Sequence, residues 1–260
     1  TYARHYGDKV LVRGVKNGER FTSRHEFRPT LFVKSQKPSQ YKSIYGENVA
    51  PIQFEGNKAA TEFFDKYKDV TNYPIYGQNY YAYQYITEKY PGDIKWNKQD
   101  ISIWSMDIET TADNGFPDVD NPREQLLVIT LQDNNTKKIK TFGLHGWQPG
   151  PETKDLDVDY VACRDEYTLL KTFLEWWQEN CPDIITGWNS ALFDIPYLLA
   201  RTERILGEGE HKKFSPFGLV NKRKIRFAQR EMTAYEITGV AQLDYLDLYK
   251  KFTYITRESY

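Results

Sequence analysis

The pattern of hydrophobic and polar residues divides the first hundred positions into short strands and one helix. Apolar residues predominate before the Asn17-Gly18 pair and a second β-rich run follows it, which is the pattern of a tight β-hairpin. A Pro-Gly-Asp turn at 91–93 marks a domain boundary near residue 100. The expected elements are strands at 10–15, 20–23 and 30–34 and a helix at 58–67. Together they predict a small α+β domain.

From residue 101 onward, predicted strands and helices follow one another in the order of an α/β domain. Pro182 ends one helical pattern and Gly207 ends another, because neither residue continues a helix well. The order strand, strand, strand, helix, strand, helix resembles the ribonuclease-H architecture. The expected elements are strands at 101–110, 125–132 and 138–142, a helix at 165–180, a strand at 183–186, a helix at 194–206, a hairpin at 224–230 and 234–238, a strand at 240–244 and a helix at 245–252.

Seven tyrosines lie between residues 73 and 90. Aromatic rings can stack on single-stranded bases, but they also fill cores and interfaces. Packing is the preferred interpretation, and base stacking is the alternative.

Composition narrows the class of protein. The chain has 260 residues, of which 40% are hydrophobic and 27% are charged, as in a globular protein with one large or two ordinary domains. No apolar run is long enough for a transmembrane helix, and no secretory signal opens the sequence. The only cysteines, Cys163 and Cys181, argue against a disulfide scaffold and suit a reducing cytoplasm. Because the sequence starts at Thr1, we expect it to be part of a longer polypeptide.

The net charge of −1 conceals an uneven distribution of charge. Residues 1–100 carry +5 and residues 101–260 carry −6, yet the segment 201–230 carries +6. A basic segment in an otherwise acidic domain suits a phosphodiester substrate, because lysine and arginine hold a phosphate backbone without reading its sequence. A solvated charged surface is the alternative for any single basic residue.

Three carboxylates carry the most specific chemical signal. Asp107 and Glu109 are two residues apart in a predicted strand, so their side chains share one face of the sheet. Carboxylates held together repel unless a cation lies between them, and Mg²⁺ prefers oxygen ligands. Asp194 opens a predicted helix, with Pro196 just inside it. The competing interpretations are a solvated strand end for the first two carboxylates and a helix N-cap for Asp194.

Three segments match a known arrangement of motifs: MDIET at 106–110, TGWNSALFDIPY at 186–197 with an Asn-x-x-x-Phe-Asp core, and LDYLDLYKKF at 243–252. In this order they resemble the 3′→5′ exonuclease domain of family-B DNA polymerases. The segment NGFP at 114–117 extends the similarity to polymerases of T-even-type tailed bacteriophages. The resemblance implies a ribonuclease-H-like α/β exonuclease domain at 101–260, preceded by the family's smaller α+β N-terminal domain at 1–100.

The resemblance also implies an activity and a site. The activity is the removal of 3′-terminal nucleotides by hydrolysis, which provides proofreading in DNA replication. Asp107, Glu109 and Asp194 would be catalytic and would bind two Mg²⁺ or Mn²⁺ ions. The implied DNA contacts are Phe116 with the 3′-terminal base, Asn189 and Phe193 with the last nucleotides, and Arg226 and Arg230 with phosphates. Without the resemblance, Phe116 would be interpreted as a surface-turn aromatic and Phe193 as a core residue.

The implied partners follow from the same resemblance. They are DNA, as a single-stranded 3′ end or a primer-template, the remainder of the polymerase chain and, through that chain, a sliding clamp. No membrane partner is expected. The implied location is the cytoplasm of an infected bacterial host.

One motif of the family is missing from this sequence. The family completes its site with a Tyr-x-x-x-Asp motif in a downstream helix, and no such pattern occurs between Asp194 and Tyr260. The palm motifs for nucleotide addition are absent as well. We therefore expect these residues not to polymerise DNA alone and to be weak or inactive as an exonuclease alone. Asp244 is expected to be a strand-end carboxylate near the site rather than the missing ligand.

Two other functions fit parts of the sequence. One is a non-catalytic module of a split polymerase, in which the basic, tyrosine-rich residues 1–100 bind nucleic acid or dock a partner chain. The other is a separate nuclease that acts on RNA. The family resemblance and the missing third motif weigh against the RNA nuclease.

Overall fold

The computed structural model describes residues 2–227 and 230–252, and for Phe227 and Arg230 it describes the backbone alone. The chain divides into two compact units, Thr1–Asn97 and Lys98–Tyr260. The sequence patterns predict the division at residue 100. Each unit has a hydrophobic core of its own.

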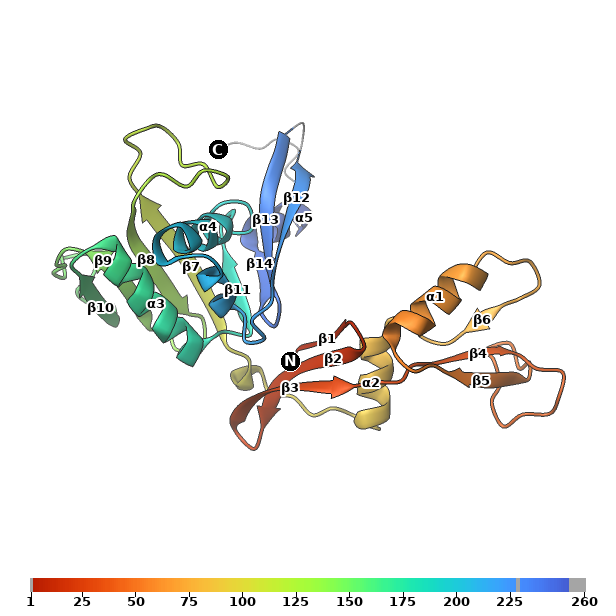
Figure 1. Ribbon diagram of the computed structural model, residues 1–260. Coiled ribbons are helices and arrows are strands. Elements are labelled where there is room, and N and C mark those ends of the chain that lie inside the picture. Colours follow the sequence, from red (N-terminus) through yellow and green to blue (C-terminus); the bar gives the residue numbers. More distant parts are fainter. Residues whose placement is uncertain (1, 228–229, 253–260) are drawn as a thin grey trace. The chain divides into compact units, whose positions relative to one another are not determined.

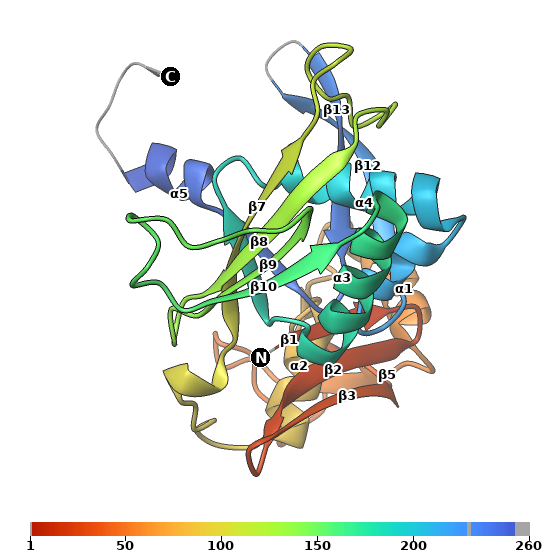
Figure 2. The same ribbon diagram turned by 90° about the vertical axis from the view of Figure 1, so that its left-hand side faces the viewer.

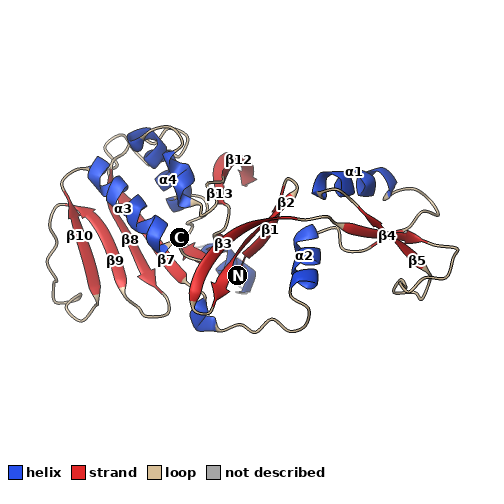
Figure 3. Cartoon of the chain, turned by 60° about the horizontal axis from the view of Figure 1, so that its bottom comes forward, coloured by secondary structure: helices blue, strands red, loops and turns tan. Residues whose placement is uncertain are grey.

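The first unit consists of two three-stranded antiparallel sheets and two helices (Figure 3). Asn17 and Gly18 have φ angles of 55° and 82° and join two strands of the first sheet, as the Asn-Gly pair predicts. The elements are β1 (Tyr2–Tyr6), β2 (Lys9–Lys16), β3 (Glu19–Glu26), β4 (Thr30–Lys34), β5 (Val49–Gln53), α1 (Asn57–Tyr67), β6 (Ile75–Tyr76) and α2 (Tyr81–Lys89).

The sequence patterns miss three strands of this unit, β1, β5 and the two-residue β6, and the helix α2. All three strands lie at the edge of a sheet, in the orders β1-β2-β3 and β5-β4-β6. An edge strand is paired on one side only, so it can contain polar residues and even the proline at position 51. Such a strand lacks the alternation on which the prediction depends.

The tyrosine-rich segment divides between the core and the surface of the first unit. Tyr81 and Tyr85 are 2% and 6% exposed and belong to the core, which confirms the packing interpretation for these two residues. The exposed members are Tyr73, Tyr80, Tyr83 and Tyr90.

A six-stranded mixed sheet forms the centre of the second unit, in the order β10-β9-β8-β7-β11-β14. Figure 2 shows β10, β9, β8 and β7 side by side. Strand β8 is antiparallel to both of its neighbours, whereas β7, β11 and β14 run parallel to one another. The unit is therefore of the mixed α/β class, as predicted. The strands are β7 (Ile103–Thr110), β8 (Leu126–Asp133), β9 (Ile139–Leu144), β10 (Val158–Cys163), β11 (Ile184–Gly187) and β14 (Ala241–Asp244), and a 3-10 helix, η1 (Lys98–Asp100), precedes them. Of these strands, only the edge strand β10 is missing from the prediction.

Helices α3 (Glu166–Asn180) and α4 (Asp194–Leu206) pack against each other and against the sheet (Figure 1). Asp165 caps α3, because its carboxylate accepts the backbone N–H of Thr168 at 2.8 Å. The guanidinium of Arg201 pairs with the carboxylate of Glu166 at 2.6 Å and joins the two buried helix faces.

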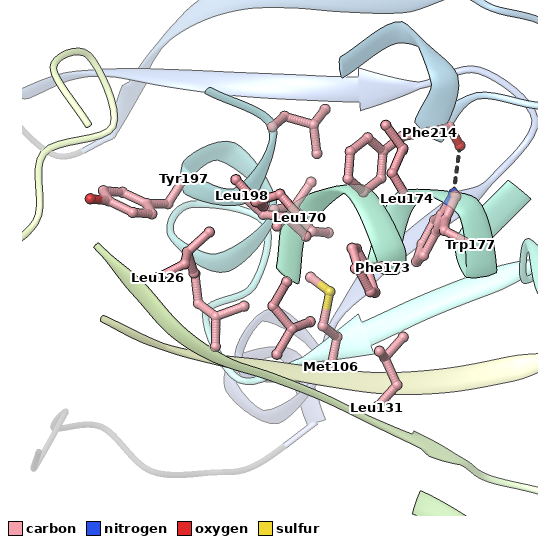
Figure 4. Close-up of a cluster of buried hydrophobic side chains, with 14 of the residues drawn as sticks. Met106, Leu126, Leu131, Leu170, Phe173, Leu174, Trp177, Tyr197, Leu198 and Phe214 are labelled. Carbon is pink, nitrogen blue, oxygen red and sulfur yellow. Dashed lines mark hydrogen bonds between the residues drawn. The ribbon is translucent and has the colours of Figure 1, made fainter. Parts of the chain in front are cut away.

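Aromatic side chains from α3 fill the space between the helices and the sheet (Figure 4). Phe173 and Trp177 are 0% and 1% exposed, and the indole N–H of Trp177 donates to the carbonyl of Phe214 at 2.8 Å. Phe214 ends the 3-10 helix η2 (Glu210–Phe214). The buried residue Met106 belongs to the same core and lies on β7. The core therefore anchors the strand that carries the first carboxylate motif.

The structure confirms a basic hairpin, formed by β12 (Val220–Phe227) and β13 (Arg230–Ile237), and the residues that join the two strands lie outside the described residues. The predicted bounds, 224–230 and 234–238, are wrong at the turn, because residues 230–233 belong to β13. Helix α5 (Tyr245–Phe252) follows β14 directly. In the part of the chain that the structure describes, no helix combines the length and the apolar character needed to cross a membrane.

Candidate active site

The side chains of β7 alternate between the core and the outside. Met106 and Ile108 are 4% and 5% exposed, whereas Asp107 and Glu109 are both exposed. The two carboxylates therefore share the face of β7 that points away from the core, as their spacing predicts. Their pairing partners on β8 are Thr130 and Val128.

Asp194 reaches β7 along the edge of the strand that faces β11. Strand β11 pairs with β7 only from Ile103 to Ser105, so no strand among the described residues pairs with β7 beyond Ser105 on the β11 side. The carboxylate of Asp194 accepts the N–H of Ile108 at 3.1 Å and takes the role of the absent strand. Asp194 thus meets β7 between the two carboxylates of the first motif.

The helix N-cap interpretation of Asp194 is wrong. The N-cap of α4 is Phe193, and it makes no side-chain capping bond. Asp194 is the first helical residue and points its carboxylate at β7 instead. A sequence cannot distinguish these cases, because the competing donor lies 86 residues away.

The surroundings of Asp194 disfavour its charged form. The residue is 4% exposed. Burial, and then the negative charge of Asp107, raise the pKa of Asp194 to about 7, although the N–H of Ile108 acts in the opposite direction. The negative charge of Asp244 also raises the pKa of Asp194, by a smaller amount. A cation beside this carboxylate would reverse the effect, since it favours the charged form.

The donor chemistry of these residues fits a hard divalent cation. Carboxylate oxygens are the ligands that Mg²⁺ and Mn²⁺ prefer. Among residues 2–227 and 230–252, however, no three His, Cys, Asp or Glu side chains are close enough together to hold a metal ion. The structure therefore brings Asp194 to β7 without assembling a complete set of ligands.

The loop after β7 is organised by a buried glutamate that the sequence did not single out. The Glu124 carboxylate accepts the hydroxyl of Thr111 at 2.6 Å and the backbone N–H groups of Asp113 and Asn114, both at 3.1 Å. These bonds, chiefly the one from Thr111, lower the pKa of Glu124. The sequence contains no signal for this arrangement, because a lone glutamate before a strand has no distinctive spacing.

The Glu124-bound loop presents Phe116 to solvent. The side chain of Phe116 is 84% exposed, and its ring lies 5.3 Å from the ring of Phe193. Phe193 in turn stacks on Tyr197 at 5.7 Å. Tyr197 is buried, and its hydroxyl donates to the carbonyl of Glu124 at 2.7 Å. Two residues from distant segments, Phe116 and Phe193, are thus brought into one aromatic row.

The remaining candidate DNA contacts lie on the loop before α4 and on the hairpin. Asn189 has a φ of +59°, a left-handed conformation that asparagine tolerates better than most residues. Arg226 is exposed on β12. The side chain of Arg230 lies outside the described residues.

Asp120, in the loop that carries Phe116, contacts both strands of the hairpin formed by β12 and β13. Its carboxylate pairs with Lys224 of β12 at 2.7 Å and accepts the hydroxyl of Thr233 of β13. These two contacts, with that of Lys224 the largest, lower the pKa of Asp120. Sequence reasoning did not identify Asp120, whose partners are more than a hundred residues away.

Comparison with known proteins identifies the family. Residues 71–260 match the family described as "DNA polymerase family B, exonuclease domain". The chain belongs to this family. The match includes both carboxylate motifs and the hairpin.

Two phage proteins are similar to nearly the whole chain. The chain is 31% identical over 276 aligned positions to the DNA-directed DNA polymerase of Enterobacteria phage T4, which covers 98% of this chain and 30% of the relative. It is 28% identical to the DNA-directed DNA polymerase of Escherichia phage RB69, with 98% of this chain and 31% of the relative covered. A DNA polymerase of Pyrococcus glycovorans is 28% identical over 56% of this chain and 16% of its own length. The chain thus spans less than a third of the length of these phage relatives.

Proposed function

We propose that this chain is the N-terminal and proofreading portion of a phage replicative DNA-directed DNA polymerase. Its second unit would remove 3′-terminal nucleotides from DNA by metal-dependent hydrolysis. One observation carries the proposal: the Asp194 carboxylate is bonded to β7 between Asp107 and Glu109, in a chain that belongs to the exonuclease family.

The strand order supports a ribonuclease-H-like fold for residues 101–260. Without the edge strand β10, the order is β9-β8-β7-β11-β14, and β8 is the one strand that runs against the others. The first strand of the second unit, β7, is then central and carries the two exposed carboxylates. Residues 1–100 would be the smaller N-terminal domain that precedes this fold in the family.

The proposed reaction is hydrolysis of the terminal phosphodiester. Water adds to the phosphorus, the bond from phosphorus to the 3′ oxygen breaks, and that oxygen takes up a proton to become the new 3′-hydroxyl. Two bound Mg²⁺ or Mn²⁺ ions would activate the water and stabilise the developing charge. Asp107, Glu109 and Asp194 would hold these ions, and the N–H of Ile108 would fix the direction in which Asp194 points.

The surrounding residues would position the DNA strand. Phe116 offers an exposed ring to the terminal base, and Phe193 supports that ring from behind. Asn189 would contact the last nucleotides, and Arg226 and Arg230 would hold phosphates. Lys224 is a weaker candidate for phosphate binding than Arg226, because Asp120 already pairs with it.

The partners and the location belong to the same proposal. The chain would act on single-stranded 3′ ends and primer-templates, together with the remainder of the polymerase chain. A sliding clamp would be reached through that remainder. The site of action would be the cytoplasm of the infected bacterial cell.

The test is excision from 5′-labelled single-stranded DNA by the full-length protein in Mg²⁺ or Mn²⁺. Asp107→Ala and Asp194→Ala should each slow single-turnover excision by roughly a thousandfold, because several kcal/mol of charge stabilisation are lost and each 1.4 kcal/mol is about a factor of ten. Chelation of the metal should have the same effect on the wild type.

Asp159→Ala is the matched control, because Asp159 is an exposed carboxylate on β10 that pairs with Lys140 at 2.8 Å. It should excise at the wild-type rate. Wild-type rates for Asp107→Ala and Asp194→Ala would show that the site is assigned to the wrong residues.

A further inference from the structure

Asp244 makes more contacts than a solvated strand end would make. It ends β14 and is 7% exposed. Its Oδ1 accepts the N–H of Asn189 at 3.0 Å and the N–H of Leu246 at 2.9 Å, and its Oδ2 accepts the N–H of Ala191 at 2.9 Å. One buried carboxylate therefore satisfies three backbone donors from two separate segments.

Only one of these three bonds is an ordinary helix cap. The bond to Leu246 reaches the second residue of α5, which makes Asp244 the N-cap of that helix. The other two bonds run to the loop between β11 and α4, more than fifty residues away. A cap alone requires neither of them.

The loop held in this way, residues 188–193, leads directly into the candidate site. It carries Asn189 and Phe193, and its next residue is Asp194. Within the loop, the N–H groups of Leu192 and Phe193 donate to the carbonyl of Asn189 at 3.2 and 3.1 Å. Because the carbonyl of Asn189 accepts both bonds, a restraint on the backbone of Asn189 also restrains the start of α4.

Aromatic contacts attach the same loop to α5 a second time. The ring of Trp188 lies 5.9 Å from that of Tyr245 and 5.6 Å from that of Tyr249. The residue before the loop, Gly187, lies close to β7, because a Cβ on Gly187 would lie 2.6 Å from the carbonyl oxygen of Met106. The loop is thus held between β7 and α5.

We propose that Asp244 is a positioning residue of the exonuclease site, which holds the loop 188–193 so that Asp194, Asn189 and Phe193 face β7 and the DNA end. The inference rests on the proposed function for its consequence in catalysis. Its structural part, the restraint of the loop by the carboxylate, stands separately. Asp244 itself would touch neither metal nor DNA.

The physical reason lies in the number of acceptors. An ionised carboxylate accepts bonds at both oxygens, whereas asparagine offers one oxygen and an NH₂ group that only donates. Asp244→Asn keeps the size of the side chain. At least one of the three backbone N–H groups would then face the NH₂ group of the asparagine instead of an acceptor oxygen. Outer contacts of this kind affect metal affinity or activity by roughly 10- to 100-fold.

The experiment compares the full-length wild type with Asp244→Asn in two measurements. The first is amide hydrogen exchange of residues 188–194, which requires no activity. Exchange should become faster in this loop by roughly tenfold or more, while β7 and β8 keep wild-type protection. The second is single-turnover excision across a Mn²⁺ titration, in which the variant should be roughly 10- to 100-fold slower and should recover partly at high Mn²⁺.

Asp165→Asn is the matched control, because Asp165 makes the same type of N-cap bond on α3 and contacts no part of the site loop. It should match the wild type in both measurements. Unchanged loop exchange in Asp244→Asn, or an excision rate equal to that of the wild type, would overturn the proposal. If Asp194→Ala excises normally while Asp244→Asn still loosens the loop, the assignment of the site has failed but the restraint by Asp244 has not.

Discussion

Glu124 shows how a single buried side chain can organise a whole loop. Its two oxygens satisfy a hydroxyl, two backbone N–H groups and the side-chain amide of Asn114. Nothing about these bonds involves the proposed chemistry directly. Their effect is to fix the turn that exposes Phe116, the residue we expect to meet the DNA end.

The order of this loop should depend on pH. Bonding to the ionised carboxylate lowers the pKa of Glu124 below its ordinary value of 4.5. A lowered pKa in the folded state means that the stabilisation is complete above pH 4.5 and is lost as the pH falls through the lower folded value. Amide chemical shifts of Asp113 and Asn114 should therefore hold at pH 5 and change at lower pH, as an NMR titration would show.

Glu124→Gln supplies the comparison for this titration. It removes the ionisable acceptor, so the loop amides should exchange faster at neutral pH. Their chemical shifts should no longer change when the pH falls below 5. Glu152→Gln, at an exposed position, should behave as the wild type does. A loop that remains equally protected in Glu124→Gln would contradict the role of the carboxylate.

At the scale of elements, the site depends on the point where two parallel strands separate. β11 follows β7 for three residues and then turns away, and Gly187 lies at that point against the carbonyl of Met106. There is no room for a side chain there, because a Cβ would also lie 2.9 Å from the Cβ of Ser190. The separation allows Asp194 to reach Ile108.

Gly187→Ala should therefore disturb both stability and activity. The added methyl group must displace backbone, which costs about 1–3 kcal/mol for overpacking of this kind. Thermal unfolding should shift to lower temperature, and excision should slow because Asp194 no longer meets Ile108 correctly. Calorimetry and the excision assay would measure the two effects.

Gly146→Ala is the control for this change, since a Cβ there meets no atom within 4 Å. It should leave the unfolding temperature and the excision rate unaltered. If Gly187→Ala also leaves the unfolding temperature and the excision rate unaltered, the close approach of Gly187 to β7 affects neither stability nor activity in solution.

The sequence predicts the elements of this fold better than the contacts between them. Periodicity suffices for β7, β8, β9, α3 and α4, because their buried faces repeat at regular spacing. It fails for β1, β5, β6 and β10, which are edge strands with weak alternation, and for helix α2. The shared face of Asp107 and Glu109 follows from strand geometry. The bonds of Asp194 and of Asp244 to the loop before α4 join segments more than fifty residues apart, and those of Glu124 span a loop without a distinctive spacing, so none of them leaves a local pattern.

At the scale of the whole molecule, the concentration of negative charge at the candidate site should make stability depend on metal. After burial, the negative charge of Asp107 is the next cause of the raised pKa of Asp194. A cation that binds only the folded chain stabilises it by about 2.7 kcal/mol at a hundredfold excess over its Kd. Mn²⁺ should therefore raise the unfolding temperature of the chain relative to chelator.

Asp194→Asn separates this effect from general ion binding. The variant keeps an acceptor for the N–H of Ile108 but removes one negative charge, so it should be more stable than the wild type in chelator and should respond little to Mn²⁺. Differential scanning calorimetry measures both quantities. An equal response to Mn²⁺ in the variant would show that the cation binds elsewhere.

The bond between Asp194 and Ile108 has a consequence for how this chain can change in length. The N–H of Ile108 can be taken either by a carboxylate or by a longer β11, but not by both. An insertion between Gly187 and Asp194 would allow β11 to continue along β7 and would expel the carboxylate from its position. We therefore expect natural relatives to vary in length in surface loops such as 146–157 and to keep the number of residues between these two positions fixed.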